Sequence, residues 1–448
     1  MNLRVFFWGC SFLVLAGTAS FAQRAYAPHS VLATGNWYRI GIKQEGVYKV
    51  DVPLLTALGI TTTNLSSSAI RLYGNGGAMV DENNTSARPD DLFENPIDMN
   101  DGGDGIFNGS DFFLFYAPGP HRWLKDSASQ AFRHQKNLYT DTAYYFITIG
   151  GNGKRISRPA PATNPTLTVN SYQERYFYEN DLVNLLNSGK EWYGEAFTTN
   201  LGGSSSRTFT VDWPGLVQTQ PVTLVTDLAA RSVGANSSFS VKLNGQNTQS
   251  VNLPGVSGNF LDPTATASLQ KSQVSVSSNN LAVTFDYTPL TAGSQGWLNW
   301  FELQGRRTLV TTAGNQLFFR DWSSVQPGAV AGFVISHTSS GLMVWEVTDP
   351  LQPQAMTVSS NATQTTFNSD VSRLREYVAF TATNLLQPIA LGKQVNQDLH
   401  GTGTVDYIII THSALLAEAQ RLAAFHQQKN GYRTVIATTE QVYQEFSG

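Results

Sequence analysis

The sequence contains a single cysteine, Cys10, among its 448 residues. Cys10 lies within an apolar run from Val5 to Ala16 that follows Arg4 and is too short to span a bilayer. Together with the small residues that lead up to Ala22, this pattern predicts a secretory signal peptide over residues 1–22. The mature chain would then contain no thiol, which excludes disulfides, thiolate metal ligands and a cysteine nucleophile from it.

Two alternatives to this processing stay open. Ala25-Tyr26-Ala27 is a second candidate cleavage site. Cys10 would carry a lipid if the protein were a lipoprotein, although little apolar sequence precedes it. All of these alternatives predict an exported chain.

Charged residues and long apolar runs are also scarce. Charged side chains make up 14% of the chain, against about 25% in an average soluble protein. The formal net charge is -4 and no basic run occurs, so we expect no nucleic-acid partner. No segment beyond the signal peptide is long and apolar enough for a membrane helix, so we expect no transmembrane helix. The predicted location is the cell surface, the outer membrane or the extracellular space.

Several common catalytic motifs are absent. H-E-x-x-H, C-x-x-C, G-x-S-x-G and the Walker loop do not occur in the sequence. Two glycine-rich stretches, residues 74–77 and 150–153, lack the strand-to-helix context of a phosphate-binding loop. We predict that both are turns.

The residues that are present favour short strands joined by turns. The chain has 38 glycines, and aromatic residues make up 11% of it. The predicted fold class is mainly β, with the truncated start of an α/β domain at the carboxy-terminal end. The predicted units are a β-rich amino-terminal domain over residues 23–165, a β-sandwich over 166–320, a β extension or linker region over 321–400 and the α/β unit over 401–448.

Local signals predict individual elements near the amino terminus. Alternating runs at residues 37–42 and 47–50 lie on either side of a turn at Gly46, which predicts a hairpin. Asp51 is placed to cap a short helix that Gly59 would end.

Two further signals lie within the predicted sandwich. Asn244-Gly245 predicts a tight hairpin turn, because both residues tolerate a positive φ angle. Residues 180–187 are predicted to form one or two helical turns.

The sequence pattern changes near the carboxy-terminal end. Residues 405–411, VDYIIIT, form a continuous apolar run, as expected for a parallel strand covered by helices on both faces. Ser413 can cap a helix that Gly431 would end. A second strand then leads to Thr438, which is placed to form a capping box with Gln441 at the start of another helix. Two strands cannot complete a doubly wound sheet, so we expect the domain to continue beyond these residues.

One loop partly matches an EF-hand calcium loop. Asn100, Asp104, Ile106 and Asp111 fall at its first, fifth, seventh and twelfth positions. Gly102 stands at the third position, where an oxygen ligand is needed, and no helices flank the loop. The alternative is a turn rich in Asn and Asp. Both alternatives stay open, so calcium is the one cofactor that the sequence suggests, and no other is required.

Two kinds of side chain could serve a site. His412 follows the first parallel strand, where sites of α/β folds form, but a lone histidine without a nucleophile is more often a strand-end residue. A sugar-binding face could be lined by Trp192, Tyr193, Trp297, Trp300 and Trp345, although aromatic residues of sandwiches lie more often in the core.

Several segments resemble a known family. Residues 184–195, NLLNSGKEWYGE, resemble a segment of the PorU-like sortases of the bacterial type IX secretion system. Residues 406–412, DYIIITH, resemble the opening of the gingipain-type cysteine peptidase domain. The resemblance also includes residues 71–77, 104–117 and 345–350 and runs from about Asn36 to the final residue.

The resemblance implies a caspase-like catalytic domain that begins near residue 401. In that family a cysteine thiolate from a later strand attacks a peptide carbonyl to form a thioester, and a histidine moves protons. The sortase members cleave the carboxy-terminal signal of secreted cargo and transfer the cargo to an amine on lipopolysaccharide. The implied partners are therefore secreted cargo proteins and outer-membrane type IX secretion components. Neither catalytic residue can be assigned in this sequence.

Two non-enzymatic alternatives also stay open. The chain could be a cell-surface β-sandwich module that binds glycan or a secretion partner. It could also be a structural scaffold that holds a catalytic domain near the outer membrane.

Overall fold

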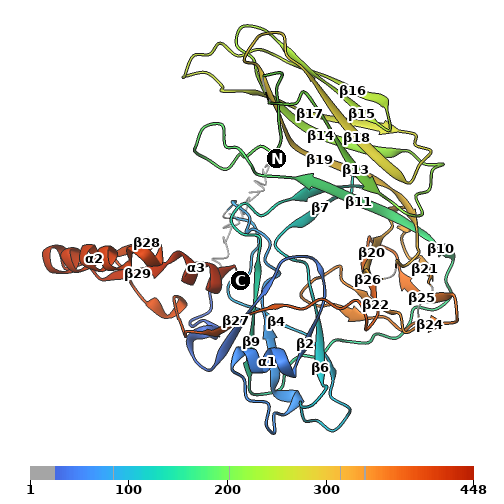
Figure 1. Cartoon of the computed structure of the whole chain (residues 1–448). Helices are drawn as coiled ribbons and strands as arrows, with labels where there is room; N and C mark the ends of the chain where they lie inside the picture. Colours follow the sequence, from blue (N-terminus) through green and yellow to red (C-terminus); the bar gives the residue numbers. More distant parts are fainter. Residues whose placement is uncertain (1–25, 84, 201, 313, 338–339, 448) are drawn as a thin grey trace, which may run out of the picture.

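The computed structural model describes residues 26–447 except 84, 201, 313, 338 and 339. The predicted signal peptide, residues 1–22, and Cys10 lie outside the described residues. The described chain is mainly β, as predicted, with three β-rich units and a strand–helix–strand segment beside them (Figure 1). Short 3-10 turns occur at Val31–Ala33, Ser67–Ala69, Trp322–Ser324, His400–Thr402 and Ser413–Leu415.

The amino-terminal domain consists of two sheets with one apolar core between them. One sheet has the strand order β27-β1-β9-β3-β4 and the other the order β2-β6-β5. Core side chains such as Ile40, Phe113 and Tyr145 are fully buried there. The elements are β1 (Trp37–Ile42), β2 (Gly46–Asp51), α1 (Val52–Leu58), β3 (Ile70–Tyr73), β4 (Glu94–Asn95), β5 (Asp98–Asn100), β6 (Phe112–Ala117), β9 (Ala143–Ile149) and β27 (Ile389–Gln394).

The hairpin predicted at the start of this domain is wrong. β1 pairs with β9 and β27, whereas β2 pairs with β6 in the other sheet. Both strands exist, but the turn between them carries the chain from one sheet to the other instead of folding it back. The helix signal is confirmed, because the Asp51 side chain accepts a hydrogen bond from Leu54 N and Gly59 ends α1 with a φ of 89°.

The second unit is a β-sandwich. One sheet has the order β11-β19-β14-β17, with β12 also on β19, and the other the order β13-β18-β15-β16. Asn244 and Gly245 adopt positive φ angles in the β15–β16 turn, which confirms that hairpin, whereas residues 180–187 form turns and no helix. The strands are β11 (Ser171–Glu179), β12 (Ala196–Phe197), β13 (Ser206–Asp212), β14 (Val222–Arg231), β15 (Ser237–Leu243), β16 (Gln246–Leu253), β17 (Thr266–Val274), β18 (Asn280–Thr288) and β19 (Gln295–Thr308).

The third unit has two four-stranded sheets, β10-β21-β25-β24 and β20-β26-β22-β23. The second of these sheets packs against β2 and β6 of the amino-terminal domain through a shared core that includes Val47, Tyr116 and Trp345. The strands of the third unit are β10 (Leu167–Val169), β20 (Leu317–Arg320), β21 (Val330–Ser336), β22 (Met343–Glu346), β23 (Gln354–Ala355), β24 (Ser359–Ser360), β25 (Gln364–Asp370) and β26 (Glu376–Phe380).

Strand pairing crosses the linear boundaries predicted from the sequence. β10 precedes the sandwich in the chain but pairs in parallel with β21, and β20 pairs with β26. β27, from the predicted extension, returns to pair with β1. The sandwich is therefore inserted into the third unit, and that unit is in turn inserted between strands of the amino-terminal domain.

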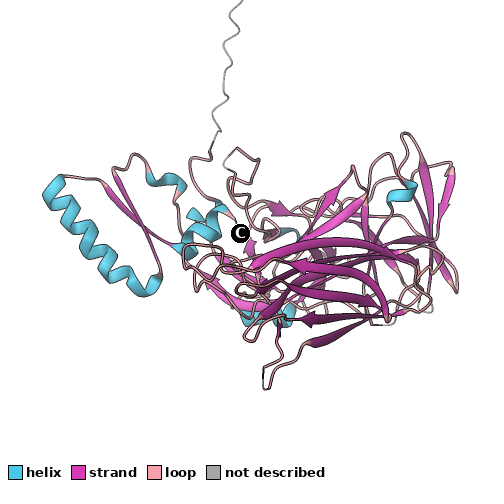
Figure 2. Ribbon diagram, turned by 90° about the horizontal axis from the view of Figure 1, so that it is seen from above, coloured by secondary structure: helices cyan, strands magenta, loops and turns pink. Residues whose placement is uncertain are grey.

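The carboxy-terminal segment forms the predicted strand–helix–strand unit. β28 (Tyr407–Thr411) and β29 (Thr434–Thr438) pair in parallel, α2 (Leu416–Asn430) covers one of their faces and α3 (Thr439–Phe446) follows. β28, α2 and β29 project away from the β-rich units, whereas α3 lies against them (Figure 2). Thr438 and Gln441 form the predicted capping box.

The cap predicted at Ser413 is wrong. The side chain of His412 accepts the hydrogen bond from Ala414 N instead, so the cap lies one residue earlier. The chain passes through a 3-10 turn at Ser413–Leu415 before α2 begins.

Candidate active-site cleft

The carboxyl ends of the two parallel strands meet at one edge of the small sheet. Thr411 pairs with Thr438 in the last register position, so His412 and Thr439 follow side by side. In open parallel sheets, ligands bind at this edge, outside the carboxyl ends of the strands. We therefore take this edge as the candidate site.

The edge opens onto a cleft of about 540 Å³. His412, Ser413 and Glu440 lie on the wall formed by the carboxy-terminal segment. The opposite wall comes from the amino-terminal domain, through the loops at residues 77–80 and 137–140. A volume of this size suits a small ligand or a few residues of a peptide.

An ion pair joins the two walls of the cleft. Arg39 of β1 donates to Glu440 of α3 over 2.7 Å, and the guanidinium also lies over the ring of Tyr144. One loop of the opposite wall depends on Gly77, which has a φ of 81° and whose absent Cβ would lie 2.1 Å from the Cβ of Ala143. The loop at Gly77 can therefore pack closely against the start of β9 only with glycine at this position.

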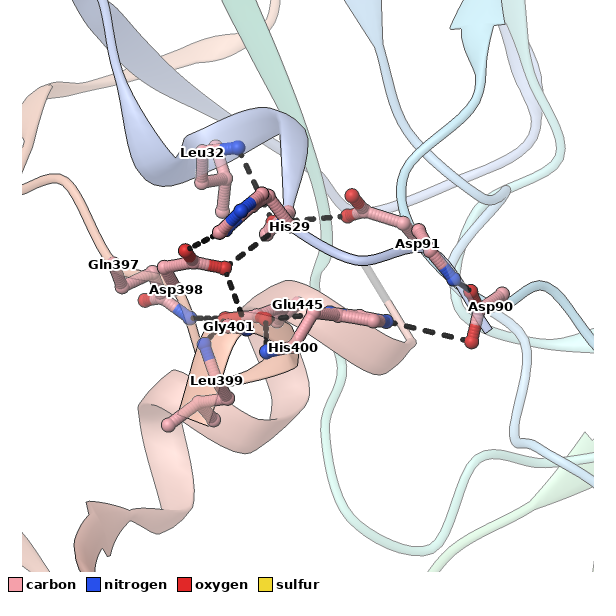
Figure 3. A network of polar contacts seen from close by, with 12 residues as sticks. His29, Leu32, Asp90, Asp91, Gln397, Asp398, Leu399, His400, Gly401 and Glu445 are labelled. Atoms are coloured by element: carbon pink, nitrogen blue, oxygen red, sulfur yellow. Dashed lines mark hydrogen bonds and ion pairs between the residues drawn. The ribbon is translucent and has the colours of Figure 1, made fainter. Parts of the chain in front are cut away.

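A buried polar network attaches α3 to the chain that leads into β28 (Figure 3). Glu445 is fully buried, and its carboxylate accepts hydrogen bonds from Gln397 Nε2 at 3.0 Å and Leu399 N at 3.0 Å. It also accepts from His400 N at 2.8 Å and contacts His400 Nδ1 at 2.6 Å. We call the segment 396–401 together with Glu445 the α3 latch.

The α3 latch extends into the amino-terminal domain through His400. His400 Nε2 lies 3.4 Å from Asp90 Oδ1. Burial alone would lower the pKa of His400, but the hydrogen bonds and charges of Glu445 and Asp90 outweigh it and raise the pKa. The His400 ring therefore bridges two carboxylates, one on each side of the contact, and they favour its protonated form.

A second set of contacts fastens the start of the described chain to the same segment. Asp398 accepts from Ser30 N at 3.0 Å and pairs with the ring of His29 at 2.6 Å. Leu32 O accepts from Gln397 N and Asn396 Nδ2. The carboxy-terminal segment is thus held by residues from both ends of the described chain, which sets the distance across the cleft.

Comparison with known proteins bears on this arrangement. Residues 400–448 match the model of peptidase family C25. The crystal structure of dimeric latent PorU from Porphyromonas gingivalis matches with a TM-score of 0.79 and 25% identity, over 94% of this chain and 39% of that chain. The chain is PorU-like in fold, and its carboxy-terminal residues 400–448 resemble peptidase family C25.

The remaining comparisons add no further argument. The CBM36-1 domain of a multidomain xylanase from the hindgut metagenome of Trinervitermes trinervoides matches with a TM-score of 0.18 and 8% identity, over 30% of this chain and 97% of that domain. A search of curated proteins finds no match. The chain spans 39% of the length of the PorU chain that it resembles.

The predicted calcium residues lie outside the cleft of this PorU-like chain. Asn100 ends β5, and the Asp104 and Asp111 side chains accept hydrogen bonds from Ile106 N and Asn108 N. The Asp104 contact is that of an Asx turn, the Asp111 contact reaches back three residues, and Phe107 is fully buried in the core. In the described part of the chain, no group of three or more His, Cys, Asp or Glu side chains could hold a metal. That finding does not test the predicted set Asn100, Asp104, Ile106 and Asp111, because two of its ligands are a side-chain amide and a backbone carbonyl. Calcium binding at this loop stays a prediction.

Sequence reasoning missed the roles of two histidines. His400 and His134 showed no pairing pattern in the sequence, yet each contacts two carboxylates in the structure. The partners of His134, Glu179 and Glu302, lie more than forty residues away from it along the chain. Tertiary packing of segments that are far apart in the chain brings the members of each cluster together, so no local signal could have revealed either cluster.

The face of β28 that α2 leaves uncovered is apolar. Tyr407 contacts the α2 residue His426, so by strand alternation Ile408 and Ile410 point to the other side, where they are 58% and 60% exposed. We predict that the double variant Ile408→Ser/Ile410→Ser lowers self-association of the purified chain in concentration-dependent size-exclusion chromatography, because exposed apolar patches drive association.

Ile409 provides the matched control for this prediction. It lies between the two exposed residues, on the face that α2 covers. Ile409→Ser should leave self-association unchanged and instead loosen α2, seen as faster amide exchange in residues 416–430. Equal self-association of the wild type and the double variant would contradict the prediction.

Within the residues that the structure describes, none of the helices is both long and apolar enough to span a bilayer.

Proposed function

We propose that the chain supplies the amino-terminal β-rich units and the first strands of the catalytic domain of a type IX secretion sortase. The whole enzyme would be a cysteine peptidase that removes the carboxy-terminal signal of secreted cargo and transfers the cargo to lipopolysaccharide through a thioester. The likeness to PorU over 94% of the chain carries this proposal. The family C25 match at residues 400–448 supports it independently.

The proposal gives this chain a structural part in catalysis. The α3 latch and the Arg39–Glu440 pair hold the edge at His412 against the amino-terminal domain. A substrate peptide bound in the cleft would then contact both walls. The cargo proteins, the type IX secretion partners and the cell-surface or outer-membrane location belong to the same proposal.

The chain by itself should not hydrolyse peptides. Its only cysteine is Cys10, which the predicted signal cleavage removes, so residues 23–448 contain no thiolate nucleophile. Purified 23–448 should show no turnover of peptides that carry a cargo carboxy-terminal signal, with or without an added amine. Turnover that persists after treatment with iodoacetamide would contradict a cysteine mechanism in this protein.

The test in cells uses the intact gene. Deleting it should leave cargo proteins with their carboxy-terminal signals attached, as measured by mass spectrometry, and restoring it should recover processing. A restored gene carrying Ala78→Trp, which narrows the cleft, should process cargo at least about tenfold more slowly, a rate change that corresponds to about 1.4 kcal/mol in the barrier.

The control for this test is Leu290→Ala. Leu290 is 68% exposed in the sandwich and does not line the cleft. It should restore processing to the wild-type level. Normal cargo processing in the deletion strain would overturn the proposed function, and wild-type processing by Ala78→Trp would overturn the assignment of the cleft.

A further inference from the structure

A row of side chains crosses the outer face of one sandwich sheet. Glu179 of β11 lies opposite Trp300 of β19, and Trp300 lies opposite Asp227 of β14. Leu269 of β17 continues the row opposite Asp227. The row alternates carboxylate, indole, carboxylate and apolar side chain, on the face turned away from the sandwich core.

A β-bulge adds an amide to this row. The register of β14 and β19 changes from Asp227 opposite Trp300 to Leu228 opposite Leu298, which leaves Asn299 as an extra residue. Leu298 and Phe301 both lie in the sandwich core, so the two residues between them face outward together. Bulges often re-aim side chains next to functional sites. Here the bulge places Asn299 and Trp300 on the same outer surface.

This outer surface forms the floor of a cavity of about 340 Å³, separate from the cleft at His412. Glu191 and Trp192, from the loop between β11 and β12, form one side, and Trp192 is 44% exposed. Residues 133–135 of β8 (Ala131–Gln135) and Lys136, which follows β8, form the other side. β8 and its hairpin partner β7 (Arg122–Asp126) belong to the amino-terminal part of the chain, and β7 lies beside β11 (Figure 1).

The polar groups on the cavity floor are held in place before any ligand arrives. Asn299 Nδ2 donates to Glu191 Oε1 at 2.8 Å and to Asp227 Oδ2 at 2.9 Å. His134 contacts Glu179 at 2.5 Å and Glu302 at 2.6 Å. Burial alone would lower the pKa of His134, but its two carboxylate partners outweigh burial and raise it. Pre-organised polar groups of this kind lower the entropy cost of binding.

The charges around the cavity favour a neutral ligand that both donates and accepts hydrogen bonds. Arg133, Lys136 and Lys190 line the cavity together with the carboxylates. A cationic ligand would meet these three cationic side chains, and an anionic ligand would meet Glu191 and Asp227. Hydroxyl groups can donate to the carboxylates and accept from the cationic groups at once.

We propose that this cavity binds a carbohydrate, with the apolar face of a sugar ring on the indole of Trp192 and ring hydroxyls on Asp227 and Glu191. Aromatic side chains bury the C–H face of a ring, while fixed polar groups orient its hydroxyls. The volume lies within the range of about 300–1,000 Å³ typical of small-ligand sites. This site does not depend on the proposed peptidase function, because it lies on the sandwich and uses none of the residues of the cleft walls except Met79.

The experiment uses the purified chain and a printed array of neutral and N-acetylated oligosaccharides, followed by calorimetry with each saccharide that binds. Wild-type protein should bind at least one saccharide. Trp192→Ala should weaken that binding about tenfold or more, and Asp227→Asn, which keeps the shape of the side chain, should weaken it by a similar factor. Trp192 is half-exposed, so its variant should keep the wild-type melting temperature.

The matched control is Phe260→Ala. Phe260 is 91% exposed on another loop of the sandwich, so its loss should leave saccharide binding unchanged. Absence of binding to every saccharide, or equal loss in all three variants, would overturn the proposal. Binding of a lysine-rich peptide at the same residues without any saccharide would also overturn it, because the cavity would then be a site for protein segments.

Discussion

Replacing Glu445 with alanine is expected to release α3 from the amino-terminal domain. The Glu445 carboxylate is the shared acceptor for Gln397, Leu399 and His400, and its side chain is fully buried. Its removal leaves Leu399 N and His400 N without their acceptor, and leaves the His400 ring with only the more distant Asp90. Breaking a buried charged pair in this way costs about 3–5 kcal/mol. Hydrogen exchange in residues 439–446 should therefore accelerate strongly.

Two further variants define the physical origin of this effect. Glu445→Gln keeps the size and one acceptor oxygen but removes the charge, so its exchange rates should lie between those of the wild type and Glu445→Ala. Glu418→Ala is the surface control, because Glu418 pairs only with the neighbouring Arg421 on exposed α2 and should leave α3 unchanged. Wild-type exchange in Glu445→Ala would show that the α3 latch does not hold the segment.

The α3 latch should also depend on pH. Folding raises the pKa of His400, so its contribution is fully present below the unfolded pKa of about 6.5. The contribution is lost as the pH rises through the higher folded value. Protection of residues 439–446 should therefore fall on the alkaline side in the wild type. A His400→Ala variant should show low protection at every pH.

Local signals predicted individual elements well. The cap at Asp51, the Asn244-Gly245 turn and the capping box of Thr438 and Gln441 all form as predicted. Each of these signals works within a few residues, through one side-chain hydrogen bond or one backbone angle. Tertiary packing therefore does not need to be known to predict them.

The sequence did not predict which distant strands pair with one another. The runs at 37–42 and 47–50 are both strands, but nothing local distinguishes a turn that makes a hairpin from one that changes sheets. The same limit explains why β10 and β27 lie outside the units in which a linear division placed them. The candidate cleft depends on these pairings, since its two walls come from opposite ends of the chain.

The candidate site residues divide in the same way, into those with a local sequence signal and those without one. His412 was suggested from its place after an apolar strand, and it does line the cleft. Trp297, Trp300 and Trp345 are buried as expected for sandwich aromatics, whereas Trp192 is 44% exposed. Trp192 follows residues 180–187, which form turns where the sequence pattern predicted a helix.

The largest loss of stability is expected at Glu376, where the three β-rich units meet. Glu376 of β26 accepts from Arg175 of β11 at 2.8 Å and pairs with Lys125 of β7 at 2.7 Å. Arg320 of β20 lies 3.5 Å from the same carboxylate. Burial alone would raise the pKa of Glu376, but these cations lower it to about 2. One carboxylate therefore compensates three cationic groups at the junction.

Glu376→Gln should lower the free energy of unfolding by about 3–5 kcal/mol, because Arg175 stays buried without this ion pair and Arg320 keeps only the more distant Glu174, at 4.0 Å. Urea unfolding followed by tryptophan fluorescence measures this loss, since Trp123 and Trp322 lie close to the junction. In the wild type, the contribution of Glu376 is present above the unfolded pKa of about 4.3 and is lost as the pH falls towards about 2.

A double variant distinguishes charge imbalance from lost packing. Glu376→Gln combined with Arg175→Met removes an anion and a cation together, so it should be more stable than Glu376→Gln alone. Lys190→Ala serves as the surface control, because its pair with Glu82 is exposed and its loss should not change the urea midpoint. If the double variant is less stable than either single variant, the junction depends on the shape of these side chains rather than on their charge balance. In that case, the insertion of one β-rich unit into another rests on apolar packing such as the contact of Val47 and Tyr116 with Trp345.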